Sequence, residues 1–144
     1  MKNRSVLFLY GLGAVLTMGM GVLYLAMPTI MPYHMDAIQT PWQDIPPLYQ
    51  KLFLALLKAA GAGYLAVGAA WAIMTAIPMR RGERWTLWAV PLTGFIAQAP
   101  LFAITLYVRF STPAHPPWIF PLAVLGLIAA GVVVTVISVK KGEK

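Results

Sequence analysis

The chain has 144 residues, of which 60% are hydrophobic and 10% are charged, and its mean hydropathy is +0.74. Because a soluble domain carries about a quarter charged residues, this composition excludes a water-soluble globule and indicates an integral membrane protein. The formal net charge is +7, and the chain has no cysteine. The lack of cysteine excludes disulfides, thiol catalysis and thiolate metal sites.

Four apolar windows are long enough to cross a bilayer, since a helix needs about 20 residues to span about 30 Å of hydrocarbon. They cover residues 6–27, 52–77, 85–108 and 118–139. None shows the alternation of apolar and polar residues that is typical of barrel strands, and a backbone in hydrocarbon must satisfy its own hydrogen bonds. The sequence therefore predicts a single all-α domain, 1–144, which forms a four-helix transmembrane bundle with a structured outer loop between the first two helices.

The distribution of positive charge predicts the orientation, because Lys and Arg in short loops stay in the cytoplasm. Eight of the eleven basic residues lie at the two termini or in the turn at 79–84, namely Lys2, Arg4, Arg80, Arg81, Arg84, Lys140, Lys141 and Lys144. We expect both termini in the cytoplasm and residues 28–51 and 109–117 outside. The net charge is thus explained by the membrane, and no nucleic-acid partner is expected.

Small residues recur at every fourth position in three of the windows. These residues are Gly13, Thr17 and Gly21, then Ala55, Ala59 and Gly63, and finally Gly126 and Ala130. Such spacing lets helix backbones approach closely where the lipid is as apolar as the side chains. Packing within the bundle is the favoured interpretation, and an oligomer interface is the alternative.

Lys58 lies within the second window, where an ionisable side chain is costly and indicates a functional site by default. No Asp or Glu lies in any window, so within the membrane Lys58 would need a polar neighbour or an anionic ligand. The predicted ligand-binding residues are Lys58, Gln98, the Ile96 carbonyl freed by Pro100, Tyr64 and Arg109. In the alternative interpretation, the long second window lets Lys58 extend to the outer headgroups.

A second candidate site lies in the segment MPTIMPYHMD. Its Met31, His34 and Met35 carry thioether and imidazole ligands that suit copper(I). Methionine is also a flexible packing residue, so a structured loop that covers the bundle is the alternative. A role in periplasmic copper handling follows only from the first interpretation.

Catalytic motifs are missing from the chain. It has no HExxH, P-loop or nucleophile elbow, and two histidines are too few for a di-iron or haem site of the usual kind. We therefore expect a protein that is not an enzyme and that needs no cofactor.

Two stretches, YHMDAIQTPWQDIPPLYQKLFLALLKAAGAGYLAVG and IPMRRGERWTLWAVPL, resemble segments of small four-span bacterial membrane proteins grouped near the DoxX-like proteins. The resemblance covers about half of the chain. It implies a four-helix bundle in the bacterial inner (plasma) membrane and carries no catalytic residues. Some DoxX-like proteins are linked to quinone or thiol chemistry, and this chain lacks the cysteine that thiol chemistry requires.

Together these patterns favour a multi-pass membrane protein that acts by association, as an accessory subunit of a membrane complex or as a homo-oligomer. The alternative is a binder or carrier of a lipid-like or anionic small molecule near Lys58 and Gln98. The expected partners are membrane lipids and other membrane subunits.

Overall fold

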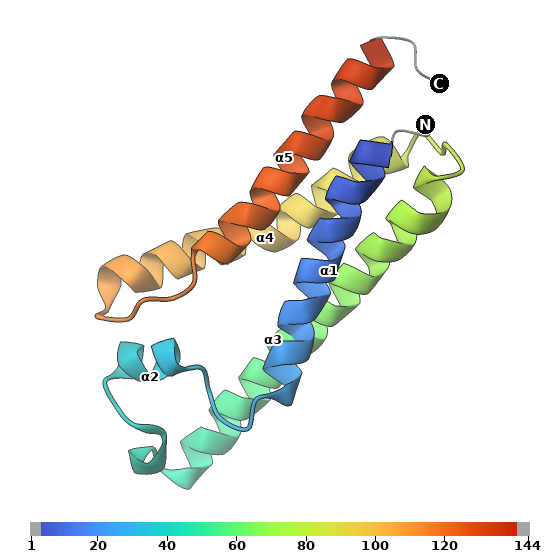
Figure 1. The fold of residues 1–144 in the computed structure, drawn as a ribbon. Helices are drawn as coiled ribbons and strands as arrows, with labels where there is room; N and C mark the ends of the chain where they lie inside the picture. The colour runs from blue at the N-terminus through green and yellow to red at the C-terminus, as the bar shows by residue number, and fades with distance from the viewer. Residues whose placement is uncertain (1–3, 141–144) are drawn as a thin grey trace.

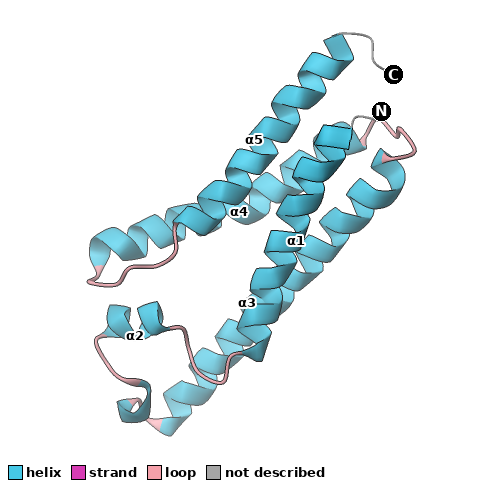
Figure 2. Ribbon diagram, viewed as in Figure 1, coloured by secondary structure: helices cyan, strands magenta, loops and turns pink. Residues whose placement is uncertain are grey.

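The computed structural model describes residues 4–140, which fold into helices and contain no strand within that range (Figures 1 and 2). The long helices are α1 (Arg4–Ala26), α3 (Pro47–Met74), α4 (Thr86–Ser111) and α5 (Ile119–Lys140). The connection between α1 and α3 contains the short helix α2 (Pro32–Ile38) and a 3₁₀ turn, η1 (Trp42–Asp44). Among the described residues, four helical segments are long and apolar enough to cross a membrane, which confirms the prediction of an all-α multi-pass protein.

The second span is longer than hydropathy alone predicts. Its helix begins at Pro47, five residues before the predicted window, because proline suits the first helical position, where its missing N–H has no intrahelical partner to lose. A π-helical segment, η2 (Thr75–Met79), continues α3 and contains Pro78. Proline cannot donate the usual backbone hydrogen bond, and the chain turns soon afterwards at Gly82, whose φ is 83°.

Helices α1 and α3 pack with their backbones almost in contact. A Cβ atom added to Gly21 would lie 2.6 Å from the backbone nitrogen of Leu65, and one added to Gly68 would lie 2.6 Å from Cγ of Met18. A Cβ atom added to Gly61 would lie 2.9 Å from Cβ of Tyr24. The small-residue face of α1 therefore packs within the bundle, as the favoured interpretation predicted. Gly63 and Gly126, in contrast, face open space.

Trp71 lies at the centre of the bundle and is almost completely buried. Its indole fills the space that two glycines leave, because a Cβ on Gly13 of α1 or on Gly94 of α4 would approach the ring to 2.8 or 2.7 Å. Tyr10 occupies the corresponding space beside Gly131 of α5. Two large aromatic side chains thus join the four helices through positions that only glycine can occupy.

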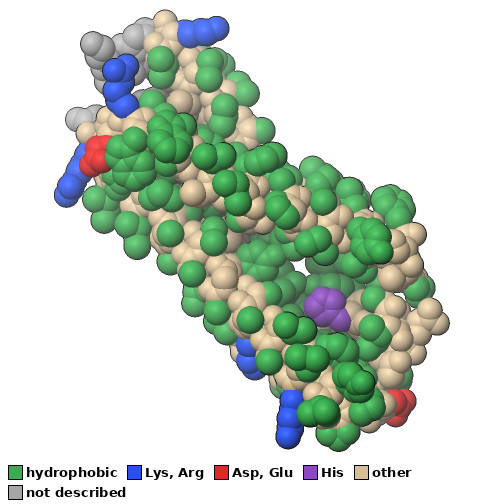
Figure 3. Space-filling model, turned by 180° about the vertical axis from the view of Figure 1, so that it is seen from behind, with side chains coloured by type: hydrophobic (Ala, Val, Ile, Leu, Met, Phe, Trp, Pro, Cys, Tyr) green, Lys and Arg blue, Asp and Glu red, His purple; other side chains and the backbone are tan. Residues whose placement is uncertain are grey.

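The helices form two pairs, α1 with α3 and α4 with α5, which are joined by contacts between α1 and α5. Arg4 and Lys140 lie at one end of the bundle, and towards the other end the two pairs diverge, with α2 between them (Figure 1). On the face shown in Figure 3, the middle of the surface is hydrophobic, and Lys and Arg side chains lie nearer to its ends. Lys2, Lys141 and Lys144 lie outside the described residues.

Gly21→Ala tests the close approach of α1 and α3. Its new methyl group would collide with the backbone of α3, so we expect the free energy of unfolding to fall by about 1–3 kcal/mol. Gly19→Ala on the same helix is the control, because nothing lies within 4 Å of its Cβ position and alanine favours a helix over glycine by about 1 kcal/mol. Thermal unfolding in mild detergent, followed by circular dichroism, should separate the two variants. Equal stabilities would contradict the close contact.

Candidate functional site

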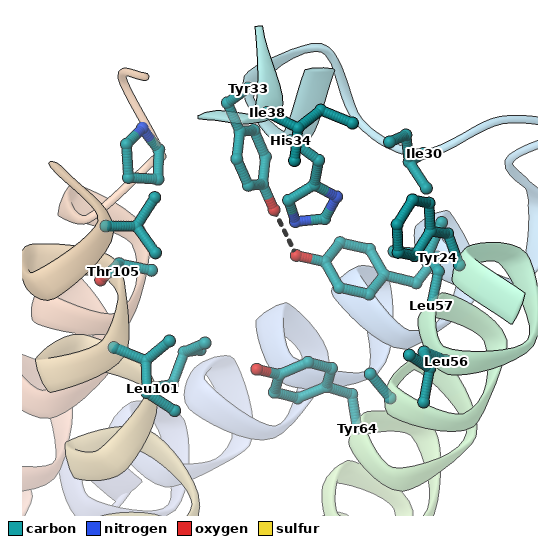
Figure 4. A pocket seen from close by; sticks show the side chains of 15 residues that line it. Tyr24, Ile30, Tyr33, His34, Ile38, Leu56, Leu57, Tyr64, Leu101 and Thr105 are labelled. Atoms are coloured by element: carbon teal, nitrogen blue, oxygen red, sulfur yellow. Dashed lines mark hydrogen bonds between the residues drawn. The ribbon is translucent and has the colours of Figure 1, made fainter. Parts of the chain in front are cut away.

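A cavity of about 370 Å³ lies where α3 and α4 diverge, and α2 covers it (Figure 4). Ten of its fifteen lining residues are aliphatic, phenylalanine or proline side chains. The other five each carry a hydrogen-bonding side-chain atom, and they are Tyr24, Tyr33, His34, Tyr64 and Thr105. Pockets for small molecules are commonly of this kind, with apolar walls and a few hydrogen-bonding groups.

The polar groups come from separate elements. Tyr24 of α1 and Tyr33 of α2 share a hydrogen bond of 2.7 Å between their hydroxyl groups. Tyr64 of α3 packs edge-on against Tyr24, with 5.9 Å between ring centroids, and its hydroxyl points into the cavity. Thr105 lies on the opposite wall, formed by α4. The arrangement places three phenol groups, with His34 and Thr105, among mostly apolar walls.

Proline residues set the position of α2. Pro28 interrupts the chain two residues after α1, and Pro32 occupies the first turn of α2. The following two residues, Tyr33 and His34, pack their rings against each other at 4.2 Å and both line the cavity. Gln39 then ends α2 in the left-handed conformation, with a φ of 51°. The short helix therefore presents consecutive aromatic side chains to the space between α3 and α4.

Burial changes the acid–base behaviour of both rings on α2. It lowers the pKa of His34, because the charged imidazolium loses solvation, and the ring is therefore neutral at physiological pH. Burial also raises the pKa of Tyr33, and its hydrogen bond with Tyr24 raises it further. Both side chains are thus uncharged donors and acceptors in the cavity.

Lys58 does not take the buried position beside Gln98 that the ligand-binding interpretation requires, and its extension to the outer headgroups stays a prediction. It is exposed, and its Nζ donates hydrogen bonds to the carbonyl groups of Leu25 at 2.7 Å and Met27 at 3.3 Å. A positive charge at the C-terminus of a helix complements the helix dipole. The structure therefore gives Lys58 a role at the end of α1 and does not bring it to Gln98.

Gln98 is fully buried in the bundle, and its Nε2 donates to Oγ1 of Thr17 at 3.1 Å. Thr17 in turn donates to the carbonyl of Gly13, one turn earlier. This chain of hydrogen bonds links α4 to α1, and Gln98 does not line the cavity. The sequence indicated how deep Gln98 lies along an antiparallel helix. It did not indicate which face of α4 the side chain occupies.

Two further predicted ligand-binding residues lie outside the cavity. Ile96, whose carbonyl was the predicted ligand group, is 61% exposed and does not line the cavity. Arg109, in the last turn of α4, donates to Nδ1 of His115 at 3.1 Å. Of the five predicted residues, only Tyr64 lines the cavity.

The three predicted copper ligands do not all face the same space. His34 lines the cavity, whereas Met31 and Met35 are not among its lining residues. Within residues 4–140, no group of three or more His, Cys, Asp or Glu side chains converges on a point that could hold a metal ion. Copper binding by Met31, His34 and Met35 stays a prediction.

Sequence reasoning missed Tyr24 and Tyr33. Both lie near the end of a predicted span, where tyrosine is common as an interfacial anchor, and the distance between them in the folded chain depends on how α2 folds back. The available signal was the pair Tyr33–His34, which lies between Pro32 and Pro41 in a short constrained segment.

Comparison of the chain with protein-family models, curated proteins and solved structures finds no match. The proposed roles below therefore depend on the geometry of the chain itself.

Lys58→Met should loosen the C-terminal end of α1. Loss of the two hydrogen bonds to backbone carbonyls should lower the local stability of the last turn of α1 by about 0.5–1 kcal/mol, because the site is exposed. This corresponds to about two- to fivefold faster amide exchange in that turn. Hydrogen–deuterium exchange with mass spectrometry of residues 23–29 measures this effect. Lys51→Met is the control, since it removes an exposed lysine from the same helix. Identical exchange in both variants would exclude this role for Lys58.

Acidification should destabilise the protein through His34. Because its pKa in the folded chain is lower than the ordinary value of about 6.5, the unfolded chain binds more protons at acid pH. The contribution of neutral His34 to the free energy of unfolding is therefore fully present above a pH of about 6.5. It is lost as the pH falls below that value. The melting temperature of the parent chain should fall more than that of His34→Gln between pH 7.5 and pH 5.5. Parallel curves for the two proteins would show that His34 does not contribute.

Proposed function

We propose that this chain is a non-enzymatic membrane protein that binds a neutral, lipid-like small molecule in the cavity between α3 and α4. The observation that carries the proposal is the convergence of three tyrosine hydroxyls on an apolar cavity. Polar groups in such surroundings are costly unless they have hydrogen-bond partners. A bound molecule with a polar head would supply those partners.

The hydroxyl groups retain capacity for a ligand. In the Tyr24–Tyr33 pair one hydroxyl donates to the other, so the accepting hydroxyl still has its own O–H to donate. Tyr64 points its hydroxyl into the same space. Thr105 donates to the carbonyl of Phe102, and its oxygen can still accept a hydrogen bond. Carbonyl and hydroxyl groups of a ligand suit this combination of donors and acceptors.

The lining also favours a neutral molecule. With His34 uncharged, none of the fifteen lining residues carries a charge, and Lys58 and Arg109 are engaged elsewhere. An anion would lose its solvation without gaining a positive partner. The cavity volume of about 370 Å³ is near the lower limit for small-molecule sites, which suits the head of an amphiphile better than a complete phospholipid.

The position of the cavity favours entry from the membrane. Leu56 of α3 and Ile104 of α4 both line the cavity, yet each is 59% exposed on the outer surface of the bundle. The hydrocarbon chain of a ligand would lie between these residues and remain in contact with lipid. Its polar end would reach the tyrosines without passing through the packed core around Trp71.

We further propose that both termini lie in the cytoplasm and that the membrane is the bacterial inner membrane. The concentration of Arg4, Arg80, Arg81 and Arg84 at the end opposite the cavity supports this orientation. The cavity would then lie towards the outer leaflet. The resemblance to DoxX-like proteins, which suggested this membrane, stays a prediction.

Association with other membrane proteins is the second candidate function. Its support is that Gly63 of α3 and Gly126 of α5 face open space although their spacing suits close helix contact. Exposed Ala59 continues the first of these faces and Ala130 the second. A second copy of the chain or a subunit of a membrane complex would pack against either face.

Ala60→Phe tests the binding site by filling it. Ala60 lines the cavity, and its neighbour Ala59 is exposed and lies outside the lining, so Ala59→Phe is a matched control. We expect Ala60→Phe to abolish binding of 1-decanoylglycerol, a neutral amphiphile, and the double variant Tyr24→Phe/Tyr33→Phe to weaken it about five- to tenfold through lost hydrogen bonds. Isothermal titration in mild detergent measures the affinity.

Binding of 1-decanoylglycerol that is equal in Ala60→Phe and Ala59→Phe would overturn the proposal, as would the absence of binding to the parent chain. Circular dichroism and melting temperature establish that each variant is folded. Native mass spectra of the same samples report copurified lipids, and multiples of 15.7 kDa would favour the second candidate function.

A further inference from the structure

A second hollow, of about 580 Å³, lies at the opposite end of the bundle from the tyrosine cavity. It is lined by Arg4, Leu7 and Phe8 of α1 and by Arg80, which follows η2. Two guanidinium groups and two hydrophobic side chains thus border one space. This combination is independent of the groups that form the cavity.

The fold holds the two arginines beside each other although they are far apart in sequence. Met79, directly before Arg80, is buried in the same hydrophobic core cluster as Val6 of the first turns of α1. These anchors place the exposed residues Arg4 and Arg80 at one edge of the bundle. Core packing therefore sets the relative position of the two backbone segments that carry Arg4 and Arg80.

Within the described part of the chain, neither guanidinium has a side-chain partner. Among residues 4–140, no side-chain hydrogen bond or ion pair engages Arg4 or Arg80. The acidic residue of this turn, Glu83, accepts a hydrogen bond of 2.6 Å from the indole N–H of Trp85. Arg81 and Arg84 add further positive charge in the same turn. The hollow therefore attracts anions.

Its hydrophobic residues identify the kind of anion. Phe8 is 67% exposed, Leu7 is half-buried against the core, and both line the hollow beside the arginines. A phosphodiester between two guanidinium groups would leave a lipid chain beside these side chains. A soluble phosphate compound would make no use of them, and the positive headgroup of a zwitterionic lipid would be repelled by the surrounding arginines.

We propose that Arg4 and Arg80 bind the phosphodiester of an anionic phospholipid whose acyl chain packs along Leu7 and Phe8. Guanidinium groups form strong, charge-assisted hydrogen bonds with phosphate oxygens. The lipid would join the start of α1 to the turn after η2, and it would bind whether or not the tyrosine cavity is occupied.

Native mass spectrometry of the full chain in detergent, titrated with dioleoyl phosphatidylglycerol, tests this site. Arg4→Gln/Arg80→Gln should lower the apparent affinity about tenfold or more. The control Arg81→Gln/Arg84→Gln removes the same charge from residues outside the lining, so it weakens only the longer-range attraction and should lower the affinity by no more than about threefold. Equal losses in the two double variants would show diffuse attraction and overturn the proposal, and so would unchanged affinity in the first.

Two further arms establish which part of the lipid is recognised. Phe8→Ala should weaken binding of dioleoyl phosphatidylglycerol, and dioleoyl phosphatidylcholine should bind the parent chain more weakly. Glycerol 3-phosphate that binds as tightly as the lipid would refute the role of the acyl chain, and equal affinity for both lipids would refute the preference for an anion. Binding of 1-decanoylglycerol should be unchanged in Arg4→Gln/Arg80→Gln, so failure of this site and failure of the cavity are distinguishable.

Discussion

The close approach of α1 and α3 is the contact on which the rest of the structure depends. In a membrane, burial of apolar side chains does not drive helices together, and dense packing must do so. Gly21, Gly61 and Gly68 allow the two backbones to touch over several turns, and a single methyl group at any of them would collide with the neighbouring helix. This contact pairs the two helices closely and directs Trp71 of α3 towards the centre of the bundle.

The second pair of helices joins the first mainly through large side chains that fill spaces beside glycine. Trp71 reaches Gly94 of α4, Tyr10 reaches Gly131 of α5, and Gln98 connects α4 to Thr17 of α1. On the side of α2, the helices α3 and α4 diverge, and the tyrosine cavity lies between them. The cavity is thus a consequence of where dense packing stops, and the short helix α2 supplies the hydroxyl and imidazole groups that cover it.

The two proposed sites lie at opposite ends of the bundle and have opposite chemistry. The tyrosine cavity has uncharged hydrogen-bonding groups between apolar walls, whereas the hollow beside Arg4 and Arg80 has two cations, without a side-chain partner among residues 4–140, next to exposed Phe8 and half-buried Leu7. A neutral amphiphile suits the first site and an anionic phospholipid suits the second. Between them lies the packed core, so each molecule would approach from its own leaflet of the membrane.

The sequence alone determined the architecture of this protein, because the length of an apolar helix is set by the thickness of a bilayer and can be counted along the chain. It also indicated that Gly13, Thr17 and Gly21 form a contact face. The tertiary structure decided what each polar residue does: Lys58 satisfies the end of α1, Gln98 binds Thr17, and only Tyr64 of the predicted ligand residues reaches the cavity. Helix rotation and the path of α2 determine these contacts, and they arise from packing between segments distant in sequence, which a linear pattern does not encode.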